Sequence, residues 1–168
     1  MSLNFDHSNK TNFQLVLNEI PIFDENEIIS YKKLTLNIFE TVAPGIEISQ
    51  LEENFLGGKT FLEGGELSFN SFNIKFLVDD EMENWIDIFN WMTTIHDQVT
   101  RMGAPRDQYE TSMSLMIFDN WGNTKRRFNF QYVWPIKLND IELSFQDDAP
   151  ILKSGATLSY DYYKVDSS

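Results

Sequence analysis

Cysteine is absent from this 168-residue chain, and its absence removes two kinds of chemistry at once. Without thiols, neither disulfides nor thiolate metal sites can be part of the design. Basic residues are also few, and the formal net charge is −13. Because nucleic-acid binding depends on cations that neutralise phosphates, we do not expect this chain to bind nucleic acid. An acidic balance suits a surface that nucleic acid passes without adhering.

Long apolar runs are missing too. No uninterrupted apolar stretch is long enough to span a bilayer, and no charged segment followed by an apolar one opens the sequence. We therefore expect a protein made in a cytoplasm and having no membrane partner. The length is that of a single domain, 1–168, which can bury a core without covalent staples. The polar residues 1–11 are expected to form a loosely ordered N-terminal arm.

Recognisable catalytic constellations are missing as well. The sequence has no nucleophile elbow, phosphate-binding loop or zinc-binding helix motif. Of the two histidines, His7 lies in the polar arm and His96 at a predicted helix end, where interaction with the helix C-terminus is favoured. Carboxylate pairs such as Asp79-Asp80 lack the spacing of a calcium loop. These patterns indicate a protein that is not an enzyme, with no catalytic residues, cofactor or metal; a hydrolase built from distant acids is the remote alternative.

What the sequence does have is apolar and aromatic alternation, including fourteen phenylalanines. A period of two residues is typical of strands that have one buried face. The pattern predicts a mainly β fold, an antiparallel β-sandwich or barrel of about seven strands with one packed helix. Alternating runs lie at residues 13–17, 34–38, 46–48, 72–78, 113–117, 128–134, 141–145 and 156–163.

One convincing helix, at about residues 80–96, interrupts the strands. Asp79 or Asp80 can cap its N-terminus by accepting a bond from a free backbone N–H group. Its apolar surface includes Trp85, Ile88 and Trp91 and leaves only a narrow polar stripe. A helix that is apolar over most of its circumference is buried on two sides. In a chain of this size, we predict that the second side faces another subunit. The stripe consists of Glu83, Asp87, Asn90 and Thr94.

Residues 49–66 differ in kind, because two Gly-Gly pairs flank a short segment with apolar side chains among acidic ones. The pattern predicts a long loop or projecting hairpin. Its apolar residues are poorly placed on an isolated monomer and favour docking on a neighbour, while folding back over its own sheet is the alternative. The candidate contact residues are Leu51, Phe55, Leu56, Phe61 and Leu62.

A basic cluster lies at the end of the hairpin predicted over 113–134. It comprises Lys125, Arg126 and Arg127. The cluster is either a solvated hairpin end or a site that pairs with an acidic neighbouring subunit. Trp121, in the turn of the same hairpin, is the aromatic residue expected to be exposed. An exposed tryptophan near acids keeps a carbohydrate-binding sandwich module open as a second function class.

Taken in order, these elements resemble the tail-tube protein family of contractile-tailed bacteriophages, which comprises the tail tube, the tube terminator and the baseplate tube initiator. The resemblance extends over nearly the whole chain. Its landmarks are the Asn12-Phe13 strand, the Pro44-Gly45-Ile46 turn, the glycine-rich loop, the Phe72–Val78 strand, the Asp79-Asp80-Glu81 helix start with Trp91, Trp134-Pro135, Ile141-Glu142-Leu143 and Asp161-Tyr162.

The resemblance implies a structural virion protein that forms hexameric rings, stacked into a contractile phage tail tube through which DNA passes without specific binding. Strands of adjacent subunits would form a continuous inner barrel, and the hairpin and N-terminal arm would reach neighbouring subunits or rings. The implied partners are further copies of the chain and the sheath, baseplate or neck. The implied location is the virion tail, after synthesis in the bacterial host cytoplasm.

Within the family, the repeating tube is the first expectation. The acidic segment at residues 19–30 is longer than in the family pattern. A tube-capping ring, either tail terminator or baseplate initiator, therefore stays open as the alternative.

Overall fold

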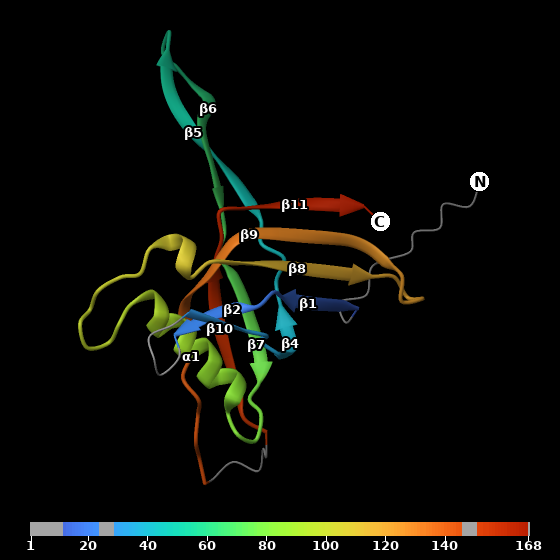
Figure 1. Cartoon of the computed structure of the whole chain (residues 1–168). Coiled ribbons are helices and arrows are strands. Elements are labelled where there is room, and N and C mark those ends of the chain that lie inside the picture. The colour runs from blue at the N-terminus through green and yellow to red at the C-terminus, as the bar shows by residue number, and fades with distance from the viewer. Residues whose placement is uncertain (1–11, 24–28, 146–150, 168) are drawn as a thin grey trace.

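Two antiparallel sheets that share one long strand form the body of the molecule (Figure 1). The computed structural model describes residues 12–23, 29–145 and 151–167. The first sheet contains β1 (Phe13–Leu17), β8 (Thr111–Phe118), β9 (Thr124–Leu138) and β11 (Tyr162–Ser167). The second contains β9, β10 (Lys153–Ser159), β7 (Phe72–Leu77) and β4 (Asn37–Thr41). The predicted mainly β, antiparallel fold with one helix is confirmed.

Four further strands form two separate hairpins. The first consists of β2 (Ile20–Phe23) and β3 (Ile29–Lys32), and the second of β5 (Ile46–Phe55) and β6 (Gly58–Phe69). The loosely ordered arm predicted at residues 1–11 lies outside the described residues, as do residues 24–28, 146–150 and 168. No helix in the described ranges is long and apolar enough to cross a membrane.

Strand β9 passes from one sheet to the other through a bend at Tyr132. The register pairs Thr111 with Val133 and Met113 with Phe130, so β9 has one residue more than β8 between these pairs. An extra residue of this kind is a β-bulge, which bends the strand that carries it. Tyr132 has a φ of 57° at this point. β9 then continues through Pro135 to Leu138, beyond the predicted end at residue 134.

The core fills the space between the two sheets. Phe72, Ile74 and Phe76 alternate on β7 and are almost completely buried. The Phe72 ring meets the edge of the Phe130 ring across the core, with 5.1 Å between centroids. Full burial of each such side chain contributes about 1.5–3 kcal/mol. Buried side chains from β8 and β10 complete the layer: Met113, Leu115, Ala156 and Leu158.

Helix α1 (Glu83–Ile95) begins three residues later than the earliest predicted start. The N-cap residue is Met82, which makes no side-chain cap bond, but the Asp79 carboxylate accepts a bond from the backbone N–H of Asn84 at 3.3 Å. The Asn84 side chain in turn donates to the Leu77 carbonyl at 2.8 Å, which ties the helix start to the end of β7. These polar contacts fix the direction in which the helix leaves the sheet.

Within the subunit, α1 packs on β2 and β9. Asp87 faces inward and forms a 2.8 Å ion pair with Lys32 of β3, and this hydrogen bond raises the pKa of Lys32. Asp87 and Thr94 of the polar stripe are buried, whereas Glu83 is exposed. β2 covers one side of the helix with the buried side chains of Ile20 and Ile22, whereas Ile86 and Phe89 on the opposite side stay exposed, so the contact of that side with another subunit stays a prediction.

The strand predicted at residues 141–145 does not form. After Leu138, the backbone N–H of Asn139 makes one last bond to the Gly155 carbonyl at 2.8 Å, and the chain then leaves the ladder. Residues 139–144 have no strand structure. Leu143 keeps 79% of its side chain exposed, so its alternation with Ile141 reflects no packed sheet face.

We predict that Trp91→Ala lowers the free energy of unfolding by about 3–5 kcal/mol, the range for truncation of a buried aromatic side chain. Trp91 is fully buried, and its Nε1–H donates to the Tyr109 carbonyl at 2.7 Å. Trp85→Ala is the matched control on the same helix and should cost about 1–2 kcal/mol because Trp85 is half-buried. Urea unfolding followed by circular dichroism measures both. Equal losses would contradict this assignment of the helix faces.

We predict a delayed tyrosine ionisation from Tyr160. Its hydroxyl donates to the Asn70 carbonyl at 2.6 Å, and burial raises its pKa to about 12. Because the folded state favours the neutral phenol, this stabilisation is complete below the unfolded pKa near 10 and is lost as pH rises through about 12. In a phenolate absorbance titration, Tyr160→Phe should remove one late-ionising group. Loss of a group that titrates near its ordinary pKa would refute the prediction.

Candidate subunit-contact surfaces

The β5–β6 hairpin projects from the two sheets as a free arm (Figure 1). Phe55 pairs with Gly58, which leaves a two-residue turn of Leu56 and Gly57. Their φ angles are 48° and 83°, and positive values at both positions are those of a type I′ turn, the kind that suits a tight hairpin. The projecting loop or hairpin predicted at residues 49–66 is thus confirmed as a hairpin.

The hairpin is anchored at its base and kinked above it. Phe69, the last residue of β6, packs edge-on against Tyr160 and Tyr163 with centroid distances of 6.0 and 5.7 Å. Farther out, Ser49 lies opposite the second Gly-Gly pair, where the register shifts. A Cβ on Gly64 would collide with Ser49, and Gly65 has a φ of 72°. The glycines therefore permit a bulge that no other residue type would fit easily.

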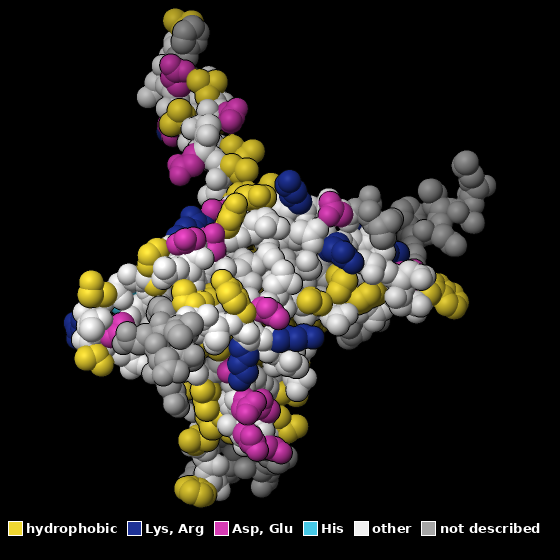
Figure 2. Space-filling model, viewed as in Figure 1, with side chains coloured by type: hydrophobic (Ala, Val, Ile, Leu, Met, Phe, Trp, Pro, Cys, Tyr) yellow, Lys and Arg dark blue, Asp and Glu magenta, His cyan; other side chains and the backbone are white. Residues whose placement is uncertain are grey.

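Apolar side chains on the outer hairpin remain uncovered within the subunit. Leu51 is 59% exposed, Phe61 62%, Leu62 47% and Leu56 93%. Figure 2 shows hydrophobic and acidic side chains interspersed along this arm. The alternative in which the segment folds back over its own sheet is therefore excluded. The side chain of Phe55, the remaining candidate here, lies outside the described part of the structure.

Of the three helix residues predicted to contact another subunit, only Trp85 has a solvent-accessible side chain. Ile88 and Trp91 are 1% and 0% exposed. Because their side chains have almost no accessible surface, they cannot contact a neighbouring subunit as predicted. Trp85 is half-buried and stacks on Phe89, with 5.8 Å between centroids and 10° between the ring planes. Ile86, 42% exposed, lies beside them.

Sequence reasoning missed Ile86 and Phe89 as surface residues. A helical wheel does place Trp85, Ile86 and Phe89 together, on the side away from Asn84, Asp87 and Ile88. The wheel is misinterpreted when polar residues are assumed to face solvent. Asn84 and Asp87 are instead buried and hydrogen-bonded.

The turn between β8 and β9 presents a tryptophan on a rigid tip. The Asp119 carboxylate accepts bonds from the backbone N–H groups of Trp121 and Asn123, both at 2.8 Å. The bond from Asn123 is the main cause of a lowered Asp119 pKa. Trp121 is 87% exposed, as predicted. Of the basic cluster that follows, Arg126 and Arg127 are exposed and Lys125 is half-buried.

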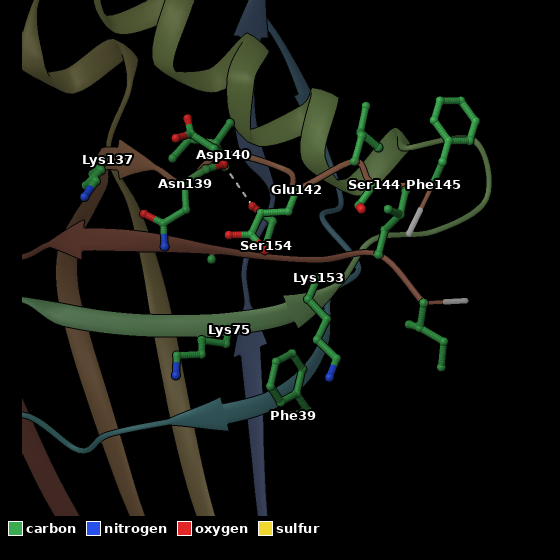
Figure 3. Close-up of a pocket in the computed structure, with 15 residues that line it drawn as sticks. Phe39, Lys75, Lys137, Asn139, Asp140, Glu142, Ser144, Phe145, Lys153 and Ser154 are labelled. Atoms are coloured by element: carbon green, nitrogen blue, oxygen red, sulfur yellow. Dashed lines mark hydrogen bonds between the residues drawn. The ribbon is translucent and has the colours of Figure 1, made fainter. Parts of the chain in front are cut away.

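A groove of about 1040 Å³ lies at the opposite end of β9, bordered by β4, β7, β10 and residues 139–145 (Figure 3). Two of the lysine side chains that line the groove already have partners. Lys75 is ion-paired with Glu40 at 2.7 Å, and Lys153 lies over the Phe39 ring. The Ser154 hydroxyl donates to the Asn139 carbonyl at 3.0 Å, the contact dashed in Figure 3. Among the described residues, no three metal-ligating side chains come together.

Comparisons with known proteins point in one direction. A family model described as "Phage tail tube protein" matches residues 4–166. The chain is similar to the tail tube terminator protein of Enterobacteria phage T4, with 27% identity over 168 residues that cover 96% of this chain and 90% of that protein.

Solved structures of contractile injection systems share the fold. One is the sheath/tube terminator of the extracellular system called PVC, with a TM-score of 0.60, 12% identity, and coverage of 99% of this chain and 100% of that one. Another is the tube-terminating cap of the anti-feeding prophage, with a TM-score of 0.59, 11% identity and full coverage of both chains. A chain of the PVC sheath-tube complex matches equally well, with a TM-score of 0.60, 13% identity, and coverage of 99% of this chain and 95% of that one. The fold alone therefore does not separate tube from terminator.

We predict that the outer hairpin can be removed without loss of subunit stability. Replacing residues 51–62 by Asn-Gly joins Gln50 to Glu63, which already pair, through a two-residue turn that favours hairpins. Because the removed side chains that the structure describes are exposed, the free energy of unfolding should change by less than about 1 kcal/mol. Urea unfolding is the measurement, with Leu115→Ala as a core control. A loss as large as that of Leu115→Ala would mean that the hairpin packs on its own subunit.

Proposed function

The chain belongs to the phage tail tube protein family, and from that premise we propose that it forms the ring that terminates the tube of a contractile tail. Proteins of this family are structural components of the tail. We propose that this chain has the same role, as a single domain spanning 1–168 and with no enzymatic activity of its own.

The choice of terminator over repeating tube rests on the sequence relative. The T4 protein that aligns along nearly the whole of both chains bears the name of tube terminator. This shifts our choice from the repeating tube, the first expectation from the sequence, to its capping alternative. The hairpin formed by β2 and β3 overlaps the longer acidic segment at 19–30, and its strand β2 packs on α1 as part of the subunit.

The observation that carries the proposal of a ring is the uncovered β5–β6 hairpin. The core of the subunit is complete without it, yet it extends apolar side chains into solvent, an arrangement typical of an interaction site. Sheet edges support the same reading, because β1, β4 and β11 each pair on one side only among the described strands. Free edges can continue a sheet into the next copy. Copies joined head to tail in this way form a ring when the rotation between neighbours closes.

We propose a homohexamer in which the hairpin and the outward side chains of α1 contact neighbouring copies or tail proteins. The end ring of the tube, the sheath and the neck are the partners expected of a terminator. The net charge of −13 would let DNA pass through the central hole without specific binding.

Electron microscopy of the purified protein, beside its solution mass, tests the proposal. Single closed rings with a central hole, and arrest of tube growth when the protein is added to elongating tube subunits of its phage, are the expected results. The variant with residues 51–62 replaced is the matched control and should remain monomeric. Long filaments would instead assign the chain to the repeating tube. A protein that stays monomeric at high concentration and leaves tube growth unchanged would refute the terminator.

A further inference from the structure

We infer that the β8–β9 tip of one copy docks on the β5–β6 hairpin of the next copy, an inference that rests on the proposed ring. The basic tip is defined here by Trp121, Arg126 and Arg127. The acidic hairpin is defined by residues 50–66. Three observations support this pairing. The two surfaces carry opposite charge, each has exposed apolar side chains, and they lie at separate positions on the subunit.

The hairpin and the tip carry opposite charge. Residues 50–66 contain four glutamates and one lysine. Lys59 already pairs with Glu52 at 2.6 Å, so Glu53 and Glu63 remain without a cation within ion-pair distance among the described residues. Excess negative charge on an exposed arm favours a basic partner surface.

The tip supplies that basic surface in a chain that is otherwise strongly acidic. Residues 119–127 contain three basic residues and one carboxylate, Asp119, which is committed to the bonds that hold the turn. Arg126 and Arg127 are exposed, and no carboxylate of the described residues forms an ion pair with either guanidinium group. Arginine readily forms charge-assisted, bidentate contacts with carboxylates.

The two surfaces also carry matching apolar anchors. Trp121 is 87% exposed on a turn whose backbone is fixed by Asp119, so it can be buried with little loss of conformational entropy. On the hairpin, Leu51 pairs directly with Leu62, which places their exposed side chains next to each other on one face. Tryptophan and arginine are the residue types most often found at the energetic centre of protein interfaces.

The positions of the two surfaces favour contact between copies. In Figure 1 the hairpin and the β8–β9 tip extend from the body in different directions, and both ends are open to solvent. A contact between two different surfaces of identical subunits is heterologous, and repetition of such a contact around an axis generates a ring. The groove of Figure 3 is a poorer docking site for the acidic hairpin than the basic tip is. Lys75 and Lys153 already have partners there, and the carboxylates of Asp140 and Glu142 line it.

Charge reversal tests the pairing. We expect Arg126→Glu/Arg127→Glu, and separately Glu53→Lys/Glu63→Lys, each to raise the protein concentration needed for half-maximal ring formation at least about tenfold, as measured by sedimentation velocity. The quadruple variant with both changes restores opposite charges and should recover most of that loss. Lys137→Glu/Lys153→Glu and Asp140→Lys/Glu142→Lys are controls with the same charge changes at exposed sites near the groove, and should assemble like the natural chain.

The outcomes separate this pairing from the ring itself. If the natural chain forms rings and both reversed pairs assemble as well as the controls, the pairing is overturned while the terminator proposal stands. A quadruple variant no better than either pair would likewise overturn it. If the natural chain forms no ring, alone or at tube ends, the terminator proposal fails first.

Cross-linking detects the contact even where rings form only on tube ends, and the lack of natural cysteine makes it specific. An Asn120→Cys variant mixed with a Thr60→Cys variant, with tubes present, should yield a disulfide-linked dimer under mild oxidation. Asn120→Cys mixed with Lys137→Cys is the control and should not cross-link. Capped tubes without the dimer would contradict the pairing.

Discussion

The packing of strand β9 against β7 is the contact on which the rest of the structure depends. Phe130 on the first half of β9 meets Phe72 across the core, and the strand then bends at Tyr132 to join the second sheet. Arg106 supports the bend, because its guanidinium group lies 4.8 Å from the centre of the Trp134 ring and pairs with Asp161 and Glu110. The two ends of this one strand therefore place the basic tip and the groove at opposite ends of the body.

Aromatic packing extends from the same core to the hairpin. Phe130 contacts Tyr160 and Tyr163, which in turn hold Phe69 at the base of β6. The Tyr163 hydroxyl donates to the Pro44 carbonyl at 3.0 Å, before β5 begins. The base of the hairpin is thereby fixed to the core, while its outer part contacts solvent. This combination gives a rigidly aimed arm whose apolar side chains are free to meet a neighbour.

Sequence patterns predicted the elements well where periodicity alone decides the outcome. The alternation at Phe72, Ile74 and Phe76 and the Gly-Gly pairs of the hairpin correspond to observed structure. Predictions from periodicity failed where contacts between residues distant in sequence determine the structure. Alternation of Ile141 and Leu143 could not reveal that none of the described strands pairs with them. The buried Asp87 could not be assigned without Lys32, which lies far away in sequence and supplies its compensating charge.

The subunit thus has a complete core and leaves apolar side chains of the β5–β6 hairpin exposed, which is the physical basis of the proposed ring. The most direct measurement is a cryo-electron microscopy map of the assembled tube end. This account predicts a single closed ring in which each β5–β6 hairpin lies against an adjacent copy and its leucines are covered. A ring in which every hairpin is surrounded by solvent would contradict it.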